Sequence, residues 1–505
     1  MSSSSHKRGR KFLWILGALL TFVALIAVGH FAWSRYERRQ LLADIRQLQQ
    51  AGEPILPEDF NASSGEIAGN PVPEWRAAAA AVNTTLVRDW LDPMRRAEVQ
   101  LPLTPREAAA LAKVVQGNQP VLLHTRAAAG MTGKPDWQLH FPSPAYGLLL
   151  PDLGQQRTVA EILCAAALEA HQRGDDAAAV EFVCQLLALQ RAVFCQPVMV
   201  GHLVALGIGS LDDDTIQQIA PDLRIGTFSD SASRPARPDQ IRLLIHELLD
   251  ETAQRDGQKY ALRTQRMCQV DAATEVAEGK ISLAAVTQFR PGGAPTNGVG
   301  GYFLSPLLYA DGRIVLRQTT KAIDAALAPD WPSSQVKLQS LIDHSRLNGS
   351  QHFLASMLLP SFDRMIQQDF RLMADHRLCA IQLAARWYAI DHDGRQPPSL
   401  DDLAPRYLAT IPLDPMTQGS RLHYRPGPDP IIYSAGTNGI DDGGSEQPID
   451  PSRSTDNRWE RKDVVTHLLR QPRTDNVDET DASIFPDDAT PPAQGQPATA
   501  PATSG

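Results

Sequence analysis

Cysteine is scarce in this sequence. Its five residues (Cys164, Cys184, Cys195, Cys268 and Cys379) lie mostly within apolar helical patterns, and no two have CxxC spacing. An odd number of cysteines over this length is not a disulfide framework. Cys164 and Cys184 could face each other across one helical hairpin, where an oxidising compartment would allow a bond. The alternative interpretation is that they are buried free thiols.

Basic charge is also in short supply. The chain has 48 Lys and Arg residues against 57 Asp and Glu residues, a net charge of −9, and no basic stripe. Binding nucleic acid requires a clustered basic face, so nucleic acid is excluded as the main partner. A content of 43% hydrophobic and 21% charged residues is ordinary for folded protein, and a length of 505 residues predicts two or more domains.

Motifs for catalysis and nucleotide binding are missing as well. The sequence has no GxSxG and no HExxH. The glycine-rich segment 289–306 lacks both the Gly-Lys-Ser/Thr of a phosphate loop and the GxGxxG spacing, so we expect a loop between helices there. Asp391-His392-Asp393 cannot converge on one point, because neighbouring positions on a helix point in different directions. We therefore predict no enzymatic activity, with an envelope hydrolase of unrecognised site in the helical domain as the alternative.

One apolar run is long enough to cross a membrane. Residues 12–33 read FLWILGALLTFVALIAVGHFAW and contain no Asp, Glu, Lys or Arg, and about 20 apolar residues suffice to span a bilayer. A signal peptide has a shorter apolar region that ends in a small-residue cleavage site. Here the run leads straight into the charged amphipathic segment SRYERRQLLADIRQLQQ. We therefore expect a retained transmembrane helix over 12–33.

The charges that flank this span predict its orientation. The tail 1–11 is short and purely basic, which favours a cytoplasmic amino terminus by the positive-inside rule, although Arg35, Arg38 and Arg39 follow the span. The predicted location is the bacterial inner (cytoplasmic) membrane, with the bulk of the chain outside the cytoplasm.

Helical periodicity dominates the predicted extracytoplasmic domain, residues 34–375. The clearest unit is a helical hairpin over Thr158–Phe194, whose two runs are separated by a glycine C-cap and an aspartate N-cap at 173–176. It is similar to a tetratricopeptide unit, but a helical-repeat adaptor for a peptide would need about three such units. Further helices are expected over Asp239–Arg255, Ser333–Leu347 and Phe353–Asp391, the last with a kink at Pro360.

The segment 376–446 has the organisation of a small α+β module. Ser399 and Asp402 form a capping box that opens a short helix after the long one. Arg421–Arg425 and Ile431–Ser434 alternate like two strands of a hairpin, and a loop rich in glycine and aspartate follows. Residues 447–505 are rich in Asp, Thr, Pro, Gln and Ala, which predicts a disordered tail with one short helix near Val464.

The ordered motifs of this module resemble the C-terminal domain of the major pseudopilins of type II secretion. Over Arg377–Glu446, the letters GRQPPSLDDL, RYL, PLDP, LHYR and IIYSAGTNGIDDGG are similar to that family's GRYPSLxDL, YL, PxDP, YxY and YSxGxDGxxGG. The resemblance implies calcium bound in the last loop. Gln396 and Met416 depart from the family pattern, and the membrane span lies far upstream of the module's own helix. We infer a borrowed small domain on a membrane-anchored protein rather than a pilus subunit.

The last loop also has ligands for a hard cation on chemical grounds. Asp441 and Asp442 supply carboxylates, Asn438 supplies an amide oxygen, and the glycines let backbone carbonyls turn inward. Calcium takes about six to eight such oxygens. The alternative is a Gly/Asn/Asp turn held by bonds between side chains and the backbone. The predicted metal ligands are Asn438, Asp441 and Asp442, for a structural calcium ion.

These features predict a mainly α protein. It has a single amino-terminal membrane helix, a helical extracytoplasmic domain and a small pseudopilin-like module. The predicted function is that of a non-catalytic envelope protein that scaffolds or binds a protein partner, associated with machinery like that of type II secretion. Its partners are the membrane and a second envelope protein, and nothing in the sequence specifies an oligomeric state.

Overall fold

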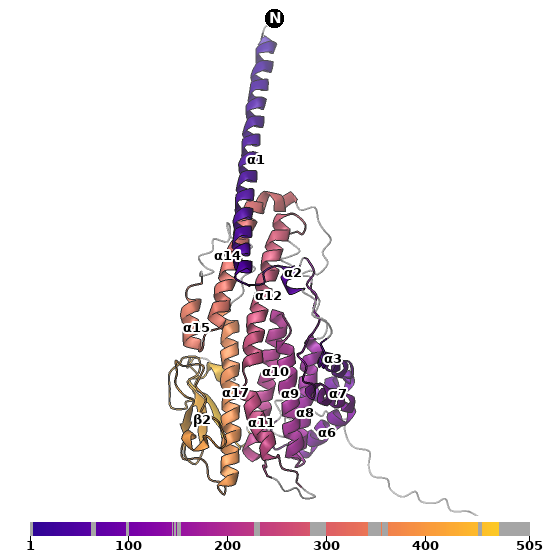
Figure 1. The fold of residues 1–505 in the computed structure, drawn as a ribbon, viewed down its shortest axis with the longest axis vertical. Helices are drawn as coiled ribbons and strands as arrows, with labels where there is room; N and C mark the ends of the chain where they lie inside the picture. The colour runs from indigo at the N-terminus through magenta and orange to yellow at the C-terminus, as the bar shows by residue number, and fades with distance from the viewer. Residues whose placement is uncertain are drawn as a thin grey trace, which may run out of the picture.

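The computed structural model describes residues 4–61, 67–96, 100–143, 145, 148, 153–226, 233–282, 299–341, 355, 362–452 and 457–473. Within these residues the fold is mainly helical and has one small three-stranded sheet, which confirms the prediction of a mainly α protein. A long amino-terminal helix projects from an elongated helical body, and the sheet lies beside the helix labelled α17 (Figure 1).

The helices fall into three groups along the chain. The first group is α1 (Ser4–Gln50), α2 (Pro57–Phe60), α3 (Val72–Ala80), α4 (Thr84–Leu86), η1 (Val87–Leu91), α5 (Asp92–Arg96), α6 (Pro105–Gly117) and α7 (Gln119–Ala129). The second is α8 (Leu153–Gln172), α9 (Asp176–Phe194), α10 (Met199–Ile219), η3 (Ala220–Asp222), α11 (Pro238–Leu249) and α12 (Thr252–Ala277). The third is α14 (Val299–Ala326), α15 (Trp331–Leu338), α17 (Phe362–Asp391), η5 (Leu400–Leu403) and η6 (Arg458–Glu460).

Helix α1 joins the apolar segment to the body without a break. Its apolar side chains are exposed from Trp14 to Trp33, whereas Leu41 and Ile45 are buried against α12 and α14. By length and composition its apolar part could cross a membrane, and none of that part is buried. Helix α9 is apolar enough to pass the same test, but 67% of its apolar window is buried inside the protein. We therefore interpret α9 as a core helix.

The predicted helical hairpin is confirmed as α8 and α9. Gly174 ends the connection with φ of +95°, a conformation that glycine adopts without steric cost. The Asp175 side chain then caps α9 by accepting a hydrogen bond from the Ala178 backbone N–H. Helix α10 packs against both helices of the hairpin, so the three form one layer of the body.

Two of the predicted helical boundaries are wrong. The helix expected over Asp239–Arg255 is divided between α11 and α12, because Asp250 leaves the helical conformation and its side chain accepts a bond from the Thr252 N–H. The helix expected over Ser333–Leu347 is α15, which ends at Leu338. Residues 342–347 lie outside the described residues.

The glycine-rich segment expected to be a loop is helical from Val299 onward, and α14 continues through Pro306. The side chains of Leu308 and Tyr309 are buried against α1 and α12, and this burial outweighs the poor helix propensity of the preceding glycines. In the long carboxy-terminal helix, the predicted start at Phe353 and the kink at Pro360 lie outside the described residues, and α17 is described from Phe362.

The helical domain and the small module share one hydrophobic core. The boundary expected between residues 375 and 376 falls inside α17, which is buried along most of its length. One continuous cluster of buried side chains contains residues of the first helices, such as Trp75, together with Ile432 and Val464 of the sheet. The module is therefore packed onto the body rather than tethered to it.

The sheet has the order β1–β2–β3, with both pairs antiparallel. Strands β1 (His423–Arg425) and β2 (Ile431–Ser434) confirm the predicted hairpin. Strand β3 (Val464–His467) corrects the prediction of a disordered tail from residue 447 and of a helix near Val464. Its alternating burial, with Val464 buried and Val465 half-buried, is the period of a strand.

Candidate functional site

Two pairs of carboxylate and imidazole lie between α10 and α17. His202 of α10 has its Nε2 2.8 Å from Asp369 Oδ1 of α17. Farther along the same two helices, Asp213 of α10 has its Oδ2 3.7 Å from His376 Nε2 of α17. In the first pair α10 supplies the imidazole and α17 the carboxylate, whereas in the second pair α10 supplies the carboxylate and α17 the imidazole.

The first pair is joined by a direct hydrogen bond. Its two side chains bond each other directly, and Gln254 Nε2 of α12 donates to both the Asp369 carbonyl oxygen and Oδ1, at 2.9 and 3.2 Å. The Phe194 ring packs against the His202 imidazole with centroids 5.0 Å apart. Three helices thus surround a directly bonded pair, although His202 Nδ1, Asp369 Oδ2 and Gln254 Oε1 have no hydrogen-bond partner among the described residues.

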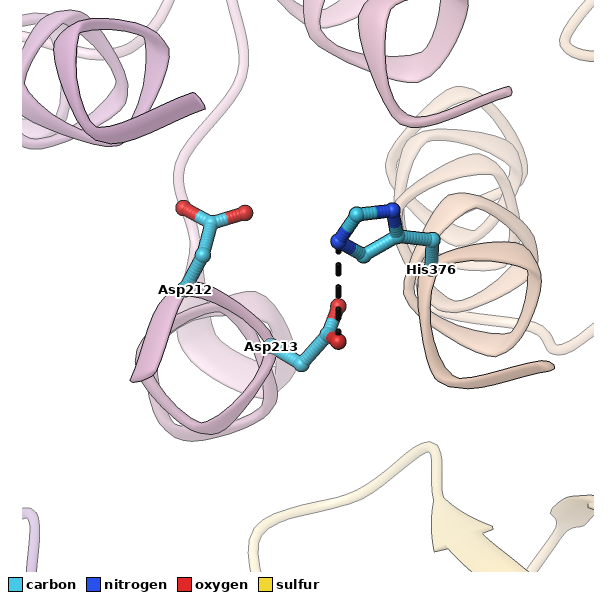
Figure 2. Close-up of side chains that lie close together, drawn as sticks. All are labelled: Asp212, Asp213 and His376. Carbon is cyan, nitrogen blue, oxygen red and sulfur yellow. Dashed lines mark ion pairs between the residues drawn. The ribbon is translucent and has the colours of Figure 1, made fainter. Parts of the chain in front are cut away.

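The second pair has a third member, Asp212, and is not joined by a direct hydrogen bond. The side chains of Asp212, Asp213 and His376 are buried, at 0%, 2% and 6% exposure. Figure 2 shows Asp213 facing His376 across the gap between the two helices, with Asp212 extending from the neighbouring position of α10. One ligand atom from each of the three lies within 4.8 Å of the others, which is close enough to hold a metal ion.

Both aspartates are buried because α10 is covered on several sides. Helices α8, α9, α12 and α17 all pack against it, so consecutive positions that diverge by about 100° both point into protein. None of the four carboxylate oxygens has a hydrogen-bond partner among the described residues, and neither does His376 Nε2. The group therefore has five buried polar atoms without a hydrogen-bond partner among the described residues.

The electrostatics of the group follow from this burial. Burial raises the pKa of Asp212 well above its usual range, and it raises the pKa of Asp213 likewise, with the charges of Asp375 and Asp212 adding to the effect. Burial lowers the pKa of His376 to about 4, so its imidazole is neutral at pH 7. Two ionised carboxylates would need a counter-charge here.

The next carboxylate, Asp375, has partners from the carboxy-terminal segment. Trp459 Nε1 donates to Asp375 Oδ2 at 3.1 Å, and Arg458 Nη2 lies 3.3 Å from Asp375 Oδ1. Arg458 Nη1 also donates to Gln217 of α10 at 2.8 Å. Helix η6 thus covers this end of the interface between α10 and α17.

The nearby thiol is not a nucleophile. Cys379 is fully buried, and its Sγ donates to the Asp213 carbonyl oxygen at 3.7 Å. Burial raises its pKa well above the ordinary value, so the thiolate is disfavoured. Cys164 and Cys184 are free in the structure, and burial raises the pKa of each to about 12.

A cavity of about 660 Å³ opens beside the group, between the helical body and the sheet. Thr215, two positions after Asp213 on α10, lies in its wall together with Glu161 and Cys164 of α8. The opposite wall contains His467 of β3.

The structure brings the predicted calcium ligands into one loop after β2. Asp441 Oδ1 accepts hydrogen bonds from the Tyr433 hydroxyl at 3.0 Å and from the Gly443 N–H at 2.9 Å. The Gly443 bond is the main reason that the pKa of Asp441 is lowered. Asn438 Nδ2 donates to Asp442 Oδ2 at 3.0 Å, and Asn438 Oδ1 accepts from the Ile440 N–H. The hydrogen-bonded turn accounts for this geometry, and calcium binding stays a prediction.

A residue that the sequence did not single out closes this loop. Asp463 is fully buried, and its carboxylate accepts hydrogen bonds from the N–H groups of Gly444 and Ser445, both at 2.8 Å, and from that of Asp442 at 3.3 Å. It lies in the segment expected to be a disordered tail. The signal available in the sequence was the β-branched run Val464–Thr466 that follows it, which is typical of a strand.

The chain was compared with protein-family models, with curated proteins and with solved structures, and none of them matches it.

Proposed function

We propose that this protein is a non-catalytic, single-pass membrane protein whose helical body is held at the membrane surface as a scaffold for an envelope partner. The observation that carries the proposal is the continuity of α1, which has an exposed apolar half and a half packed on α12 and α14. A helix without a break holds the body at a fixed position relative to the bilayer.

Contacts between the apolar segment and the body support a short distance to the membrane. His30 Nε2 lies 2.9 Å from the Phe303 carbonyl oxygen, and the hydroxyls of Ser34 and Ser305 are 2.8 Å apart. Phe303 is 67% exposed and Leu304 is 43% exposed at this first described part of the α14 surface. Apolar side chains at the level where a membrane helix leaves the bilayer are stabilised by the interface.

Ion pairs fix the base of α1 to the body. Arg313 of α14 pairs with Glu37 at 3.1 Å and with Asp44 at 3.2 Å, and Arg38 pairs with Glu278 at 3.0 Å. The Arg313 pairs are partly buried and the Arg38 pair is more exposed, and together they set the register in which α1 packs. The residues 34–50 are thus a structural element of the body, whereas residues that follow a cleaved signal peptide need not pack on anything.

The proposed orientation places the amino terminus in the cytoplasm, in the bacterial inner membrane. Protease treatment of spheroplasts tests it, with one epitope tag before residue 1 and another after residue 505. We expect the carboxy-terminal tag to be digested and the amino-terminal tag to be protected until detergent is added. Digestion of the amino-terminal tag alone would show the opposite orientation. Recovery of the full-length protein in the soluble fraction would show that α1 is not a membrane anchor.

The scaffolding role has support from packing rather than from an identified partner. The small module resembles the carboxy-terminal domain of type II secretion pseudopilins, and we propose a partner within that kind of machinery. Crosslinking in intact membranes followed by mass spectrometry tests this, with a protein that ends at residue 33 as the control. Secretion components crosslinked to the full chain and not to the control would support the proposal, and their absence would remove it.

We also propose a structural calcium ion in the loop of Asn438, Asp441 and Asp442. The three side chains lie in one short loop beside β2, and glycines 439, 443 and 444 have positive φ values that let carbonyls turn inward. Millimolar calcium should raise the melting temperature of the wild type and leave that of the variant Asp441→Ala/Asp442→Ala unchanged. The same melting temperature for the wild type with and without calcium would contradict the proposal of a calcium ion in this loop.

A further inference from the structure

The gap between Asp213 and His376 has the width of a coordinated metal ion. Their facing atoms, Oδ2 and Nε2, are 3.7 Å apart, which is too long for a hydrogen bond. Two ligands on one tetrahedral zinc ion, each bonded at about 2.1 Å, are about 3.4 Å apart. The observed distance between Oδ2 and Nε2 is therefore closer to that of two ligands on one metal ion than to that of a direct hydrogen bond.

The first pair, His202 and Asp369 on the same two helices, provides an internal comparison. His202 and Asp369 are 2.8 Å apart and take a further bond from Gln254, and no third carboxylate or imidazole joins them among the described residues. The same helix pair can thus bring an imidazole and a carboxylate into direct contact. At Asp213 and His376 the helices leave them apart, and a third potential ligand lies alongside.

Asp212 is that third ligand. Its side chain is completely buried, both of its oxygens lack a hydrogen-bond partner among the described residues, and one of them lies within 4.8 Å of the Asp213 and His376 ligand atoms. A buried carboxylate without a partner is unfavourable. Two such carboxylates on adjacent positions lie beside one imidazole, so the three side chains offer three ligand atoms to a single cation.

We propose that Asp212, Asp213 and His376 bind one divalent transition-metal ion of the zinc class. An imidazole nitrogen favours zinc over calcium or magnesium, which prefer oxygen ligands throughout. Two carboxylates balance the charge of one divalent ion, so the occupied group is neutral in the interior. Water or the second oxygen of a carboxylate completes the coordination, which needs about four ligands.

The role of this ion is to cross-link α10 to α17. Helix α10 belongs to the layer of α8 and α9, whereas α17 is the helix on which the sheet packs. The ion therefore joins the helical body to the small module at the centre of their shared core. Thr215, two positions after Asp213, lines the cavity on this side of α10.

Metal content tests the proposal directly. The full-length protein is purified in detergent, stripped with a chelator, dialysed against zinc, and analysed for metal by mass spectrometry. We expect about one zinc ion per chain, which excess calcium or magnesium does not displace. The variants Asp213→Asn and His376→Gln should bind zinc at least about tenfold more weakly.

Two matched controls separate this site from other effects. The variant Asp369→Asn changes the first pair on the same helices, and Asp441→Ala/Asp442→Ala changes the proposed calcium loop. Both should bind zinc as the wild type does. If either control loses zinc together with the site variants, or if the site variants bind like the wild type, the assignment to Asp212, Asp213 and His376 is wrong.

A stability measurement decides the matter where a substitution disturbs folding. Zinc should raise the melting temperature of the wild type and leave that of Asp212→Asn/Asp213→Asn unchanged. In chelator this double variant should melt at or above the wild-type temperature, because it removes two buried unpartnered carboxylates while keeping their shape. A double variant that melts well below the chelated wild type, or a wild type that binds no zinc, would overturn the proposal.

Discussion

Gly312 of α14 lies directly against Leu41 of α1. A Cβ atom on Gly312 would be 3.3 Å from Leu41 Cδ2 and 3.4 Å from the Cβ of Ala273 on α12. The close approach of these three helices depends on the missing side chain, and it buries Leu41 to 2% exposure. This contact is where the apolar helix becomes part of the folded body.

Truncation of Leu41 should therefore destabilise the body. We expect Leu41→Ala to lower the free energy of unfolding by about 2 to 5 kcal/mol, because it leaves a cavity between α1 and α14. Thermal unfolding of the detergent-solubilised protein measures it. Leu25→Ala, at an exposed position of the same helix, is the control and should leave the body's stability unchanged. Equal effects from both variants would show that α1 does not pack as described.

The buried ion pair at the α8–α9 connection should be among the strongest polar contacts. Asp176 is fully buried, with Oδ1 2.5 Å from His171 Nδ1 and Oδ2 2.6 Å from Arg224 Nε. Asp176→Ala leaves the buried His171 and the 39% exposed Arg224 without their acceptor, so we expect a loss of about 2 to 4 kcal/mol at pH 7 after allowing for solvent at Arg224. Asp89→Ala, which breaks the surface pair with Arg88, should show no measurable change. Urea titrations of the two variants compare them.

The contribution of Asp176 should also depend on pH with a definite sign. Burial would raise its pKa, but the hydrogen bonds from His171 and Arg224 outweigh burial and hold the pKa below the ordinary 3.8. Its stabilising effect is thus fully present above pH 3.8 and is lost as the pH falls through the lower folded-state pKa. The stability difference between wild type and Asp176→Ala should stay constant from pH 7 to about pH 4 and shrink below it. A difference that grows on acidification would contradict this.

Two truncations should show where the folded chain ends. Removing residues 447–505 deletes β3, the partner of β2, and the Trp459 donor to Asp375. We expect a loss of about 4 kcal/mol or more, or failure to fold. Removing residues 474–505 keeps these contacts, including the two ion-pair bonds of Arg473 to Glu107 at 2.9 and 3.0 Å. Its melting temperature should equal that of the wild type, and a large decrease there would contradict the assigned boundary.

Asp463 should matter more for the glycine-rich loop than the exposed acids do. An amide in its place offers one acceptor oxygen to the N–H groups that the carboxylate now binds, so Asp463→Asn should cost about 1 to 3 kcal/mol. Asp393→Asn is the control, because the Asp393 side chain is 94% exposed. Hydrogen exchange of the Gly444 and Ser445 amides provides the local readout. Unchanged protection in Asp463→Asn would show that other groups hold the loop.

Local signals account for the parts of the fold that the sequence predicted. The α8–α9 hairpin is encoded by Gly174 and Asp175, whose turn and cap chemistry act within a few residues. The β1–β2 hairpin and the apolar half of α1 are likewise encoded by periodicity and run length. Asp250 shows the limit of such signals, because one side-chain bond to the backbone divides a stretch whose helical pattern continues across it.

The candidate metal group had no local signal. Asp212 and Asp213 are consecutive residues, and on an exposed helix they would be an ordinary acidic pair. Their partner His376 belongs to another helix, and the sequence shows neither that α10 is covered on several sides nor that α17 lies beside it. Strand β3 was missed for a similar reason, since its pairing with β2 crosses a segment of polar composition.

The most direct test of the anchored scaffold is the intact mass of the chain recovered from membranes washed with alkaline carbonate. A protein anchored through α1 should remain in the washed membranes with residues 12–33 still attached. Recovery of a shorter chain that lacks this segment, released into the wash, would show that the apolar helix is a cleaved signal sequence and would contradict the proposed function.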